Sequence, residues 1–352
     1  MIKPNIVVLS KLLEGTGNKT TASRICNYLQ KDFIPHLKCV TMFSSPHEFH
    51  NFVVNNDIMF IIGLHIFHTG PFLRDCNIPF MIIFGGTDVN CKQSNESVYE
   101  EMKQVLLLAR YLVAFTVTLK FKALELWPDL KAQDIFILSQ GVTTNPCTYT
   151  FKQLFLENKK VCDLENKNLF LLAGGLRPVK DQIYLFDSFS EWHQSNPNVY
   201  LVIVGPELEV CYSQMCKKKL ESCSGIYMFP TIACCCVHAL ITQSTAVINS
   251  SVSEGMSAVL LEAMKLEIPV IARQNDGNNS LITHGENGFL FNTPQEFISQ
   301  AKLLLYDNNI RRKLASNGKL YVENHHSCKN EELAYCKFLK NEIHLLNQND
   351  LV

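Results

Sequence analysis

The sequence predicts an α/β fold made of two Rossmann-like domains with a cleft between them. Short apolar runs of strand length alternate with amphipathic stretches, which is the pattern of parallel sheets covered by helices. A strand that enters a glycine-containing loop and then a helix occurs once in each half of the chain. The length of 352 residues fits two domains, because domains commonly contain roughly 100 to 200 residues.

The first half contains the elements of one such domain. Residues 6–9 are all apolar, and Ala22, Ile25, Cys26 and Leu29 recur at helical spacing after a loop. Two further apolar runs are each followed by a glycine. These features predict strands at 5–10, 58–62, 80–84 and 113–116, and helices at 20–29 and 102–112.

The second half repeats this alternation. It predicts strands at 168–173, 199–205, 246–249 and 269–272, and helices at 255–265 and 296–305. In residues 330–346, apolar side chains that include Tyr335, Leu339 and Ile343 recur at roughly helical spacing. We therefore expect a terminal helix that packs onto one of the two domains.

The boundary between the domains is predicted where the alternation stops. Between Val142 and Asn168 the chain is rich in Thr, Asn, Pro and Lys. We expect an N-terminal Rossmann-like domain at 1–155, a C-terminal domain at 156–330, and a C-terminal helix and tail at 331–352. Ligands of open parallel sheets bind beyond the carboxyl ends of the strands, so two such domains imply a ligand in the cleft between them.

Composition excludes several classes of protein. A hydrophobic fraction of 47% lies within the globular range of about 45–50% and excludes intrinsic disorder. A net charge of −1 provides no basic field, so no nucleic-acid partner is expected. The apolar run at 105–119 is interrupted by Arg110 and falls short of the roughly 18 residues of a spanning helix, so no transmembrane segment is predicted.

The cysteines and the N-terminus bear on the compartment. The 14 cysteines make up about 4% of the chain, below the roughly 8–10% of a disulfide scaffold, which favours a reduced, cytoplasmic protein. The alternative is secretion, although the first apolar run is shorter than the roughly 7–15 residues of a signal-peptide core. Three adjacent thiols, Cys234 to Cys236, cannot converge tetrahedrally without partners elsewhere. We interpret them as buried core residues and predict no metal site.

The strongest candidate site lies between Asn249 and Met264. A strand ends near Asn249, and the predicted helix beginning near Gly255 offers free backbone N–H groups and a positive dipole end to an anion. Glu254 and Glu262 are eight positions apart, about 12 Å along a helix. Two carboxylates that act on one glycosidic bond stand about 5 to 9.5 Å apart, so this spacing favours two contacts along one extended ligand. The alternative is a solvated Glu at a helix cap and a structural Glu on an amphipathic helix.

A second candidate site follows the strand at 168–173. The paired glycines Gly174 and Gly175 allow a close approach between backbone and ligand. Arg177 and Lys180 follow, and they suit a diphosphate, Arg as a bidentate fork and Lys as a point charge. The alternative is an ordinary basic surface loop.

The first domain offers weaker candidates. Gly15-Thr16-Gly17 follows a strand and opens a helix, but no Gly-Lys-Ser/Thr completes a Walker A loop and a third fingerprint glycine is missing. His65 follows the strand at 58–62. A single His at such a place is often only a packed or solvated residue.

These segments together resemble one family. The segment from Glu254 to Met264, Pro269-Val270 and the segment from Gly285 to Leu290 resemble the C-terminal signature of retaining group 1 glycosyltransferases. The Gly174 loop is similar to their diphosphate-binding loop, Gln140-Gly141-Val142 to their linker entry, and Gly86-Thr87-Asp88 to their acceptor-side loop. The resemblance implies a GT-B fold, in which two Rossmann-like domains face each other.

The resemblance also implies a reaction and roles for residues. It implies transfer of a sugar from a nucleotide-sugar donor to an unknown acceptor, with retention, with no metal ion and with no cofactor besides the donor. No Asp-x-Asp triplet occurs in the sequence, in agreement with metal independence. Carried over by position, Glu262 would hold the donor ribose, Glu254 the transferred sugar, and Lys180 the diphosphate.

Further contacts follow from the same resemblance. The N–H groups of Gly255, Met256 and Ser257 would face the diphosphate. On the acceptor side, the resemblance assigns a place in the cleft to the loop at Gly15, Thr16 and Gly17, to His65 and to Asp88. The departing phosphate itself would take the acceptor proton.

Three departures from the family pattern leave alternatives open. The family has an Arg where Gly175 stands, frequently a His where Gly85 stands, and a Gly where Ser257 stands. The alternatives are a nucleotide-sugar-binding protein that has lost turnover, and a nucleotide-sugar epimerase of the same fold.

Overall fold

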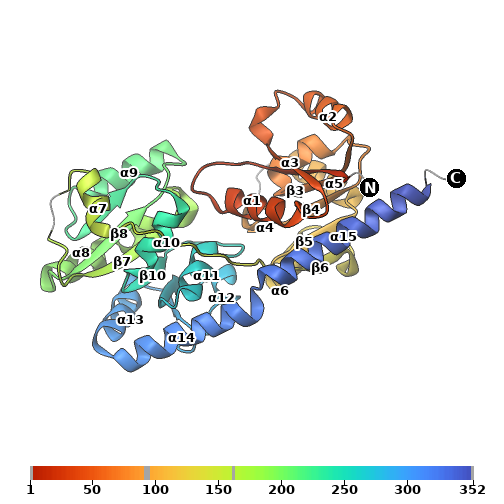
Figure 1. Cartoon of the computed structure of the whole chain (residues 1–352). Helices are drawn as coiled ribbons and strands as arrows, with labels where there is room; N and C mark the ends of the chain where they lie inside the picture. The colour runs from red at the N-terminus through yellow and green to blue at the C-terminus, as the bar shows by residue number, and fades with distance from the viewer. Residues whose placement is uncertain (1–2, 91–95, 161–162, 350–352) are drawn as a thin grey trace. The chain divides into compact units, whose positions relative to one another are not determined.

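The computed structural model of the chain describes residues 3–90, 96–160 and 163–349 (Figure 1). It divides into two compact units, of which the first comprises Met1–Gly141 with Ser327–Val352 and the second comprises Val142–His326. Each unit contains one six-stranded sheet in which every strand pair is parallel. The prediction of two α/β domains is therefore confirmed.

The sheet of the first unit has the strand order β2-β1-β3-β4-β5-β6. The order changes direction between β1 and β3. The strands are β1 (Asn5–Ser10), β2 (Ile34–Cys39), β3 (Ile58–Leu64), β4 (Phe80–Ile83), β5 (Tyr111–Ala114) and β6 (Ile135–Ile137). The helices are α1 (Gly17–Leu29), α2 (Pro46–Asn55), α3 (Ile66–Leu73), α4 (Gly86–Asn90), α5 (Glu96–Leu108), α6 (Val117–Leu126) and α15 (Cys328–Asn349).

The sheet of the second unit has the order β12-β11-β10-β7-β8-β9. Counted from its own first strand, this is the order of dinucleotide-binding Rossmann domains. The strands are β7 (Asn168–Ala173), β8 (Val199–Val204), β9 (Ile226–Phe229), β10 (Ala246–Asn249), β11 (Val270–Arg273) and β12 (Phe289–Phe291). The helices are α7 (Phe151–Glu157), α8 (Phe186–Ser195), α9 (Val210–Leu220), α10 (Cys234–Thr242), α11 (Ala258–Lys265), α12 (Asp276–Asn279), α13 (Pro294–Tyr306) and α14 (Asn308–His325).

Burial on both faces explains why the central strands are continuously apolar. In β1, Val7 and Leu9 enter one apolar cluster while Ile6 and Val8 enter the cluster on the opposite face. Alternate side chains of a strand point to opposite faces, so a strand covered on both sides has no polar face. The same reasoning explains β7 and β8 in the second unit.

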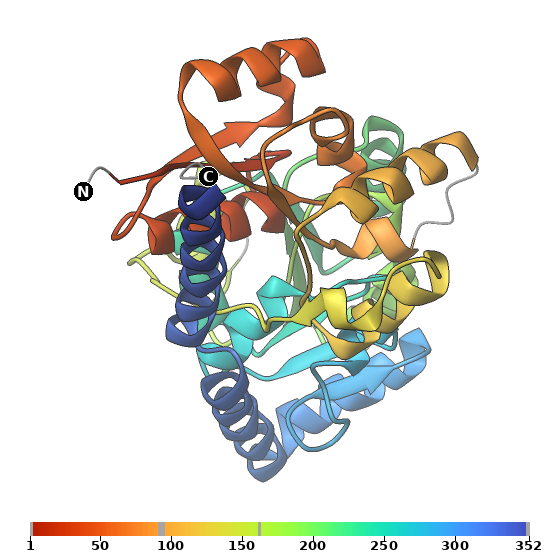
Figure 2. The same cartoon turned by 90° about the vertical axis from the view of Figure 1, so that its right-hand side faces the viewer.

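The C-terminal helix α15 covers one face of the first sheet. Tyr335, Leu339 and Ile343 pack in the same cluster as Ile6 and Val8, and Figure 2 shows α15 in dark blue running past the red α1. The packing of a terminal helix onto one domain is therefore as predicted. The C-terminal segment of the first unit begins at Ser327, whereas the sequence predicted that the C-terminal helix and tail begin at residue 331.

A buried ion pair fixes the N-terminal part of α15. Glu331 is 0% exposed and accepts hydrogen bonds from Arg24 at 2.8 and 3.1 Å, from the Tyr28 hydroxyl at 2.9 Å, and from the Gly141 N–H at 2.9 Å. Burial opposes the charge on Arg24, but Glu331 outweighs it and raises the pKa of Arg24. The Glu331 carboxylate thus links the C-terminal helix α15 to helix α1 and to the end of the N-terminal segment at Gly141.

The boundary between the units lies earlier than the predicted 155/156 junction. Phe151, Leu154 and Phe155 of α7 are buried in the core that also contains Leu171 of β7 and Val202 of β8. Helix α7 therefore belongs to the second unit, and the first segment of the first unit ends at Gly141. This helix was not predicted, because the whole region between Val142 and Asn168 was interpreted as a connection between domains.

The bounds of several predicted helices differ from the expectation. The helix expected at 102–112 is α5, which ends at Leu108, because Tyr111 and Leu112 pair with Met81 and Ile82 as part of β5. The helix expected from residue 255 is α11, which begins only at Ala258. Four strands were not predicted, namely β2, β6, β9 and β12.

Candidate functional site

The candidate site of the second unit lies where the strand order changes direction. Strand β7 pairs with β8 on one side and with β10 on the other. The chain leaves β7 into Gly174 and leaves β10 into the loop that ends at Ser257. Ligands of open α/β sheets bind beyond the carboxyl ends of strands at such a switch point.

Lys180 and Glu254 form an ion pair at this point, although the two residues are far apart in sequence. Glu254 Oε1 also accepts hydrogen bonds from Ser251 Oγ at 2.6 Å and from Asn249 Nδ2 at 3.0 Å. The side chains are 20% exposed for Lys180 and 10% exposed for Glu254. Burial alone would raise the pKa of Glu254, but the charge of Lys180 and these hydrogen bonds lower it. The carboxylate is therefore charged at neutral pH.

Asn249, at the end of β10, organises the loop that carries Glu254. Its Nδ2 also donates to Ser257 Oγ at 3.0 Å, and its Oδ1 accepts from the Ser251 N–H at 3.0 Å and from Asn278 Nδ2 at 3.1 Å. From the sequence, Asn249 was predicted only as a strand end, and Asn278 was not predicted as a site residue. The signal that could have identified Asn249 is a strand that ends in Asn and is followed by serines.

Gly277 closes this arrangement from the other side. A Cβ at Gly277 would lie 2.4 Å from the backbone oxygen of Glu254. Only a residue without a side chain allows the backbone of Glu254 to approach α12 this closely. Gly277 was not predicted from the sequence either.

The loop after β7 is bounded by a second close backbone contact. Gly174 donates its N–H to Val204 O at 2.9 Å, and a Cβ at Gly205 would lie 2.1 Å from Gly174 O. A Cβ at Gly174 itself would meet nothing within 4 Å, whereas at Gly175 it would meet Leu208 at 2.4 Å. The backbone at Gly174 is therefore open to a ligand, and the space beside Gly175 is occupied by Leu208.

Two arginines lie in or beside this loop. Within the described parts of the chain, the Nε of Arg177 is buried and has no hydrogen-bond partner. Arg273, at the end of β11, bonds to Asp181 Oδ2 at 2.7 Å, and its guanidinium lies 3.8 Å from the ring centre of Tyr184. Arg273 was not predicted as a site residue, because its partners are distant in the sequence. Asp181 and Tyr184 hold Arg273 in place, whereas Arg177 retains donor capacity.

The start of α11 differs from the expectation. Ser257 is the N-cap of α11, so Gly255 and Met256 lie in the preceding loop and outside the first helical turn. A distance of about 12 Å between Glu254 and Glu262, calculated as helical rise, does not apply because the first part of this segment is a loop. The network around Asn249 accounts for the later start, since Ser251, Glu254 and Ser257 all bond to its side chain.

Glu262 lies on α11 beside His238 of α10. Its Oε2 is 3.7 Å from His238 Nε2, and Cys234 Sγ is 3.5 Å from the same nitrogen. Burial opposes charging of His238, but Cys234 and Glu262 raise its pKa to about 10. The Asn145 N–H donates to His238 Nδ1 at 3.0 Å, so the proton of the neutral ring is on Nε2. A second proton would enter at Nδ1 in place of this hydrogen bond, so Nε2 carries a proton facing Glu262 in either state.

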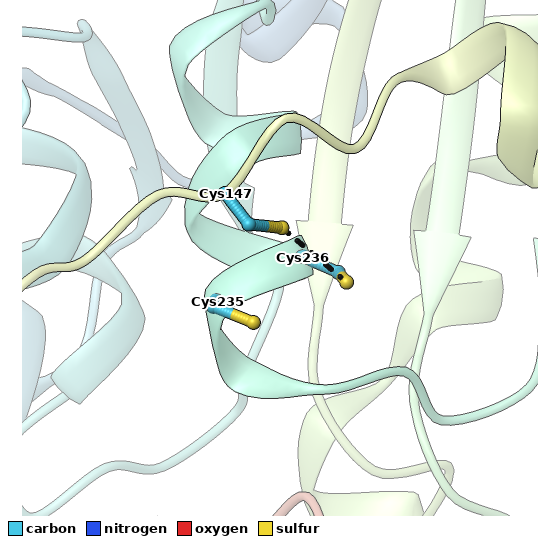
Figure 3. Close-up of side chains that lie close together, drawn as sticks. All are labelled: Cys147, Cys235 and Cys236. Carbon is cyan, nitrogen blue, oxygen red and sulfur yellow. Dashed lines mark hydrogen bonds between the residues drawn. The ribbon is translucent and has the colours of Figure 1, made fainter.

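The three consecutive cysteines are not buried core residues, so that interpretation is wrong. Cys234 is exposed, and Cys235 and Cys236 are partly exposed in the first turn of α10. Cys147 lies beside them, with its Sγ 3.6 Å from that of Cys236 (Figure 3). Cys147 was not predicted to lie near the three consecutive cysteines, because it is distant from them in the sequence.

In the first unit, the predicted residues His65 and Asp88 lie close together after the ends of β3 and β4. His65 has a φ of 66°, unusual for a residue with a side chain, and its Nδ1 lies 3.2 Å from Thr87 Oγ1 and 3.6 Å from Asp88 Oδ2. A Cβ at Gly85 would lie 1.5 Å from the His65 ring. The imidazole of His65 thus fills the space that a side chain at position 85 would need.

Asp88 is fully buried, and its carboxylate is used within the protein. It accepts the N–H groups of Gly85 at 2.8 Å and of Ile66 and Phe67 at 3.2 Å each. These bonds hold the start of α3 against the loop after β4 and position His65. A direct contact between Asp88 and an acceptor stays a prediction.

The glycine loop after β1 reaches the helix earlier than predicted, because α1 begins at Gly17 rather than at residue 20. Gly15 has a φ of 68°, and the Thr16 hydroxyl donates to Leu13 O at 2.7 Å. A Cβ at Gly17 would meet nothing within 4 Å. The loop lies at the change of strand order between β1 and β3, the counterpart in this unit of the Lys180–Glu254 position.

None of the helices in the described part of the chain has the length and apolar character that crossing a membrane requires.

The two α/β units, each with one parallel sheet, have the fold of the GT-B class. Residues 156–321 match the family model of glycosyl transferases group 1. The chain is 38% identical over 338 residues, which are 96% of this chain and 97% of the other, to glycosyltransferase 1 domain-containing protein 1 of Xenopus tropicalis. The chain therefore belongs to the group 1 glycosyltransferases.

More distant relatives and solved structures agree with this assignment. The chain is 28% identical to the putative glycosyltransferase EpsD of Bacillus subtilis over 44% of this chain and 41% of EpsD. The structure of HepE from Anabaena in complex with UDP-glucose has a TM-score of 0.78 at 15% identity and covers 96% of this chain and 99% of its own. Sucrose-phosphate synthase from Thermosynechococcus elongatus has a TM-score of 0.74 at 12% identity, with 97% and 100% covered. These structural similarities bear on the fold, and the predicted GT-B fold is confirmed.

Proposed function

We propose that this chain transfers a sugar from a nucleotide-sugar donor to an acceptor, with retention of configuration and without a metal ion. The observation that carries the proposal is the Lys180–Glu254 pair at the switch point of the second sheet, beside the open backbone of Gly174 and the buried Nε of Arg177. An acidic and a basic group at one strand end suit a ligand that has sugar hydroxyls at one end and phosphates at the other.

The donor contacts are proposed along the loops of the second unit. Lys180 and Arg177 would neutralise the diphosphate, with the Gly174 backbone in close approach. Glu254 would accept hydrogen bonds from the hydroxyls of the transferred sugar, and Glu262 from those of the ribose. The N–H groups of Gly255, Met256 and Ser257 would face the diphosphate from the loop before α11, and the Gly175 backbone would lie beside it.

The chemistry then depends on stabilising the leaving diphosphate. As its bond to the sugar breaks, negative charge develops on the phosphate oxygens, and the fixed charge of Lys180 stabilises that charge. The phosphate takes the proton of the acceptor hydroxyl on the same face of the sugar, so no protein nucleophile is needed. The absence of an Asp-x-Asp triplet from the sequence supports a reaction without a metal ion.

The acceptor is proposed to contact the first unit, through His65 and the loop at Gly15, Thr16 and Gly17. His65 is 17% exposed and is positioned by Thr87 and Asp88. A positioned imidazole suits hydrogen bonding to a hydroxyl.

The donor can be identified by a thermal-shift screen against UDP, GDP, ADP and their sugars. A ligand that prefers the native state stabilises it by about 2.7 kcal/mol at a hundred times its dissociation constant. UDP-glucose is the first donor to test, because HepE was solved in complex with it. Stabilisation by one nucleotide and its sugar supports the proposal, and no stabilisation by any member of the panel contradicts it.

Glu254→Gln tests the role of the carboxylate in turnover. Gln keeps the shape and removes the charge that pairs with Lys180, so turnover of the identified donor should fall while the nucleotide alone still binds. The matched control is Glu267→Gln, which removes a carboxylate of the same unit that pairs with Lys319 at 2.9 Å and is half exposed. Equal turnover in the two variants would refute the role of Glu254.

A donor-binding protein without turnover is the second candidate function. The space beside Gly175 is occupied by Leu208, and the space beside Gly85 by His65, so neither family side chain has room there. Calorimetry that detects donor binding, with no hydrolysis or transfer in any acceptor mixture, would favour this candidate. A product with a rearranged sugar and no acceptor adduct, identified by NMR, would instead indicate an epimerase.

A further inference from the structure

Three thiols converge on the surface of the second unit. Cys235 and Cys236 come from the first turn of α10, and Cys147 from the segment that precedes α7 (Figure 3). The three sulfur atoms lie within 4.8 Å of one another. We propose that Cys147, Cys235 and Cys236 bind one Zn²⁺ ion, with the fourth coordination position open to solvent.

The separation of the sulfur atoms fits this ion. With Zn–S bonds of about 2.3 Å, two thiolates of a tetrahedral site stand about 3.8 Å apart. Cys147 Sγ and Cys236 Sγ are already 3.6 Å apart, and the third sulfur lies within 4.8 Å of both. Small rotations about the side-chain bonds complete the triangle of ligands.

The backbone that carries Cys147 is fastened to α10. The Cys147 N–H donates to Cys235 O at 3.2 Å, and the Asn145 N–H donates to His238 Nδ1 at 3.0 Å. Gln243 Nε2 donates to Tyr149 O at 2.8 Å. These bonds hold the segment on both sides of Cys147, so the three ligands converge before any ion binds.

The start of helix α10 lies at two of the three sulfur ligands. Cys235 and Cys236 lie at the N-terminal end of a helix, where the helix dipole stabilises negative charge. Each thiol gives up its proton to solvent when it binds the ion.

A neighbouring group of possible ligands is excluded by its hydrogen bonds. Cys234, His238 and Glu262 also have ligand atoms within 4.8 Å of one another. Because the Asn145 N–H occupies Nδ1, His238 Nε2 carries the proton and has no lone pair for a metal ion. Cys234 is therefore an internal control, since it is adjacent in sequence but is not a proposed ligand.

The test is metal binding by the full chain after reduction and removal of metal by a chelator. We expect one equivalent of Co²⁺, used as a spectroscopic probe, to give the thiolate-to-metal charge-transfer absorption of a tetrahedral site, and one equivalent of Zn²⁺ to abolish it. The band should be lost in Cys147→Ser and Cys236→Ser and kept in Cys234→Ser and in Cys211→Ser, which changes an exposed cysteine of α9. Absence of stoichiometric binding, or a band lost in Cys234→Ser and kept in Cys147→Ser, would overturn the proposal.

A second measurement on the unaltered chain does not depend on how the variants fold. Zn²⁺ should protect Cys147, Cys235 and Cys236 from alkylation, as read by peptide mass spectrometry, while Cys211 and Cys234 react as before. Equal alkylation with and without Zn²⁺ would contradict the site. A disulfide between Cys147 and Cys236 in a chain that binds no Zn²⁺ after reduction would also contradict it.

Discussion

The two units have the same type of sheet but use the carboxylates that follow its strands differently. In the second unit, Glu254 at the switch point pairs with the Lys180 side chain and remains partly exposed. In the first unit, Asp88 is fully buried and uses its carboxylate on three backbone N–H groups and the His65 ring. Glu254 has a charged partner, Lys180, that a ligand can also contact. Asp88 only orders the loop that it bonds to. The comparison shows that position at a strand end does not define a role until the partners of the side chain are known.

The largest expected effect concerns the carboxylate that holds the first unit together. Glu331→Gln removes the charge that pairs with Arg24 in a buried site. Removing one partner of a buried pair typically costs about 3–5 kcal/mol, because the other charge remains buried. Urea denaturation should show a loss of this size in the free energy of unfolding.

The matched control lies on the same helix. Lys340→Gln removes an ion pair between α15 and Asp32 that is largely exposed, and it should cost about 0–1 kcal/mol. Equal losses in the two variants would mean that the buried pair adds nothing beyond a surface pair. The first unit would then not depend on Glu331.

The second prediction contrasts two glycines of the donor loop. Gly205→Ala places a Cβ 2.1 Å from Gly174 O, and overpacking of this kind typically costs about 1–3 kcal/mol. Gly174→Ala meets no atom within 4 Å, so the melting temperature should stay unchanged while donor affinity falls. Thermal unfolding and calorimetry with the identified donor separate the two effects. Unchanged affinity in Gly174→Ala would remove the backbone of this loop from the donor site.

The strands that the sequence did not predict share a position in the fold. β2 and β6 are the edges of the first sheet, and β9 and β12 are the edges of the second. Central strands are buried on both faces and therefore show a continuous apolar run, whereas edge strands such as β6, of which two residues are exposed, do not. The continuous apolar run from which strands were predicted thus reports burial on both faces, and it is weak in the edge strands of a sheet.

The candidate site was predictable only in part, for a related reason. Glu254, Lys180 and Gly174 follow strand ends, so local patterns identified them. Arg273 bonds to Asp181, and Cys147 meets Cys236, across stretches of chain that no local pattern spans. The start of α11 was also missed, since the side chain of Asn249 determines the path of the preceding loop.

The third prediction asks whether each unit serves one substrate. His65→Asn keeps a residue that tolerates positive φ and removes the imidazole that faces Thr87. The net value of a hydrogen bond, about 0.5–1.5 kcal/mol, corresponds to roughly a two- to tenfold rise in KM for the acceptor. Donor affinity measured by calorimetry should not change. A loss of donor affinity in this variant would assign His65 to the donor.

The smallest expected effect is the pH dependence that arises from Glu254. Its pKa is lower in the folded protein than its usual value of 4.5. The stability that the charged carboxylate contributes is therefore fully present above about pH 4.5, and it is lost as the pH falls through the lower folded-state pKa. The difference in unfolding free energy between the wild-type chain and Glu254→Gln should be largest near neutral pH and should narrow in acid.

Denaturant titrations at several pH values measure this difference, and Lys180→Met supplies the control. Because Lys180 provides the favourable charge, Glu254 should lose most of its pH-dependent contribution to stability in the Lys180→Met background.

The comparison with Asp88 predicts a further contrast. Its carboxylate relies on backbone N–H groups, so Lys180→Met should leave the cost of Asp88→Asn unchanged. A pH-independent difference for Glu254 would show that its hydrogen bonds to Ser251 and Asn249, and not its charge, hold it in place.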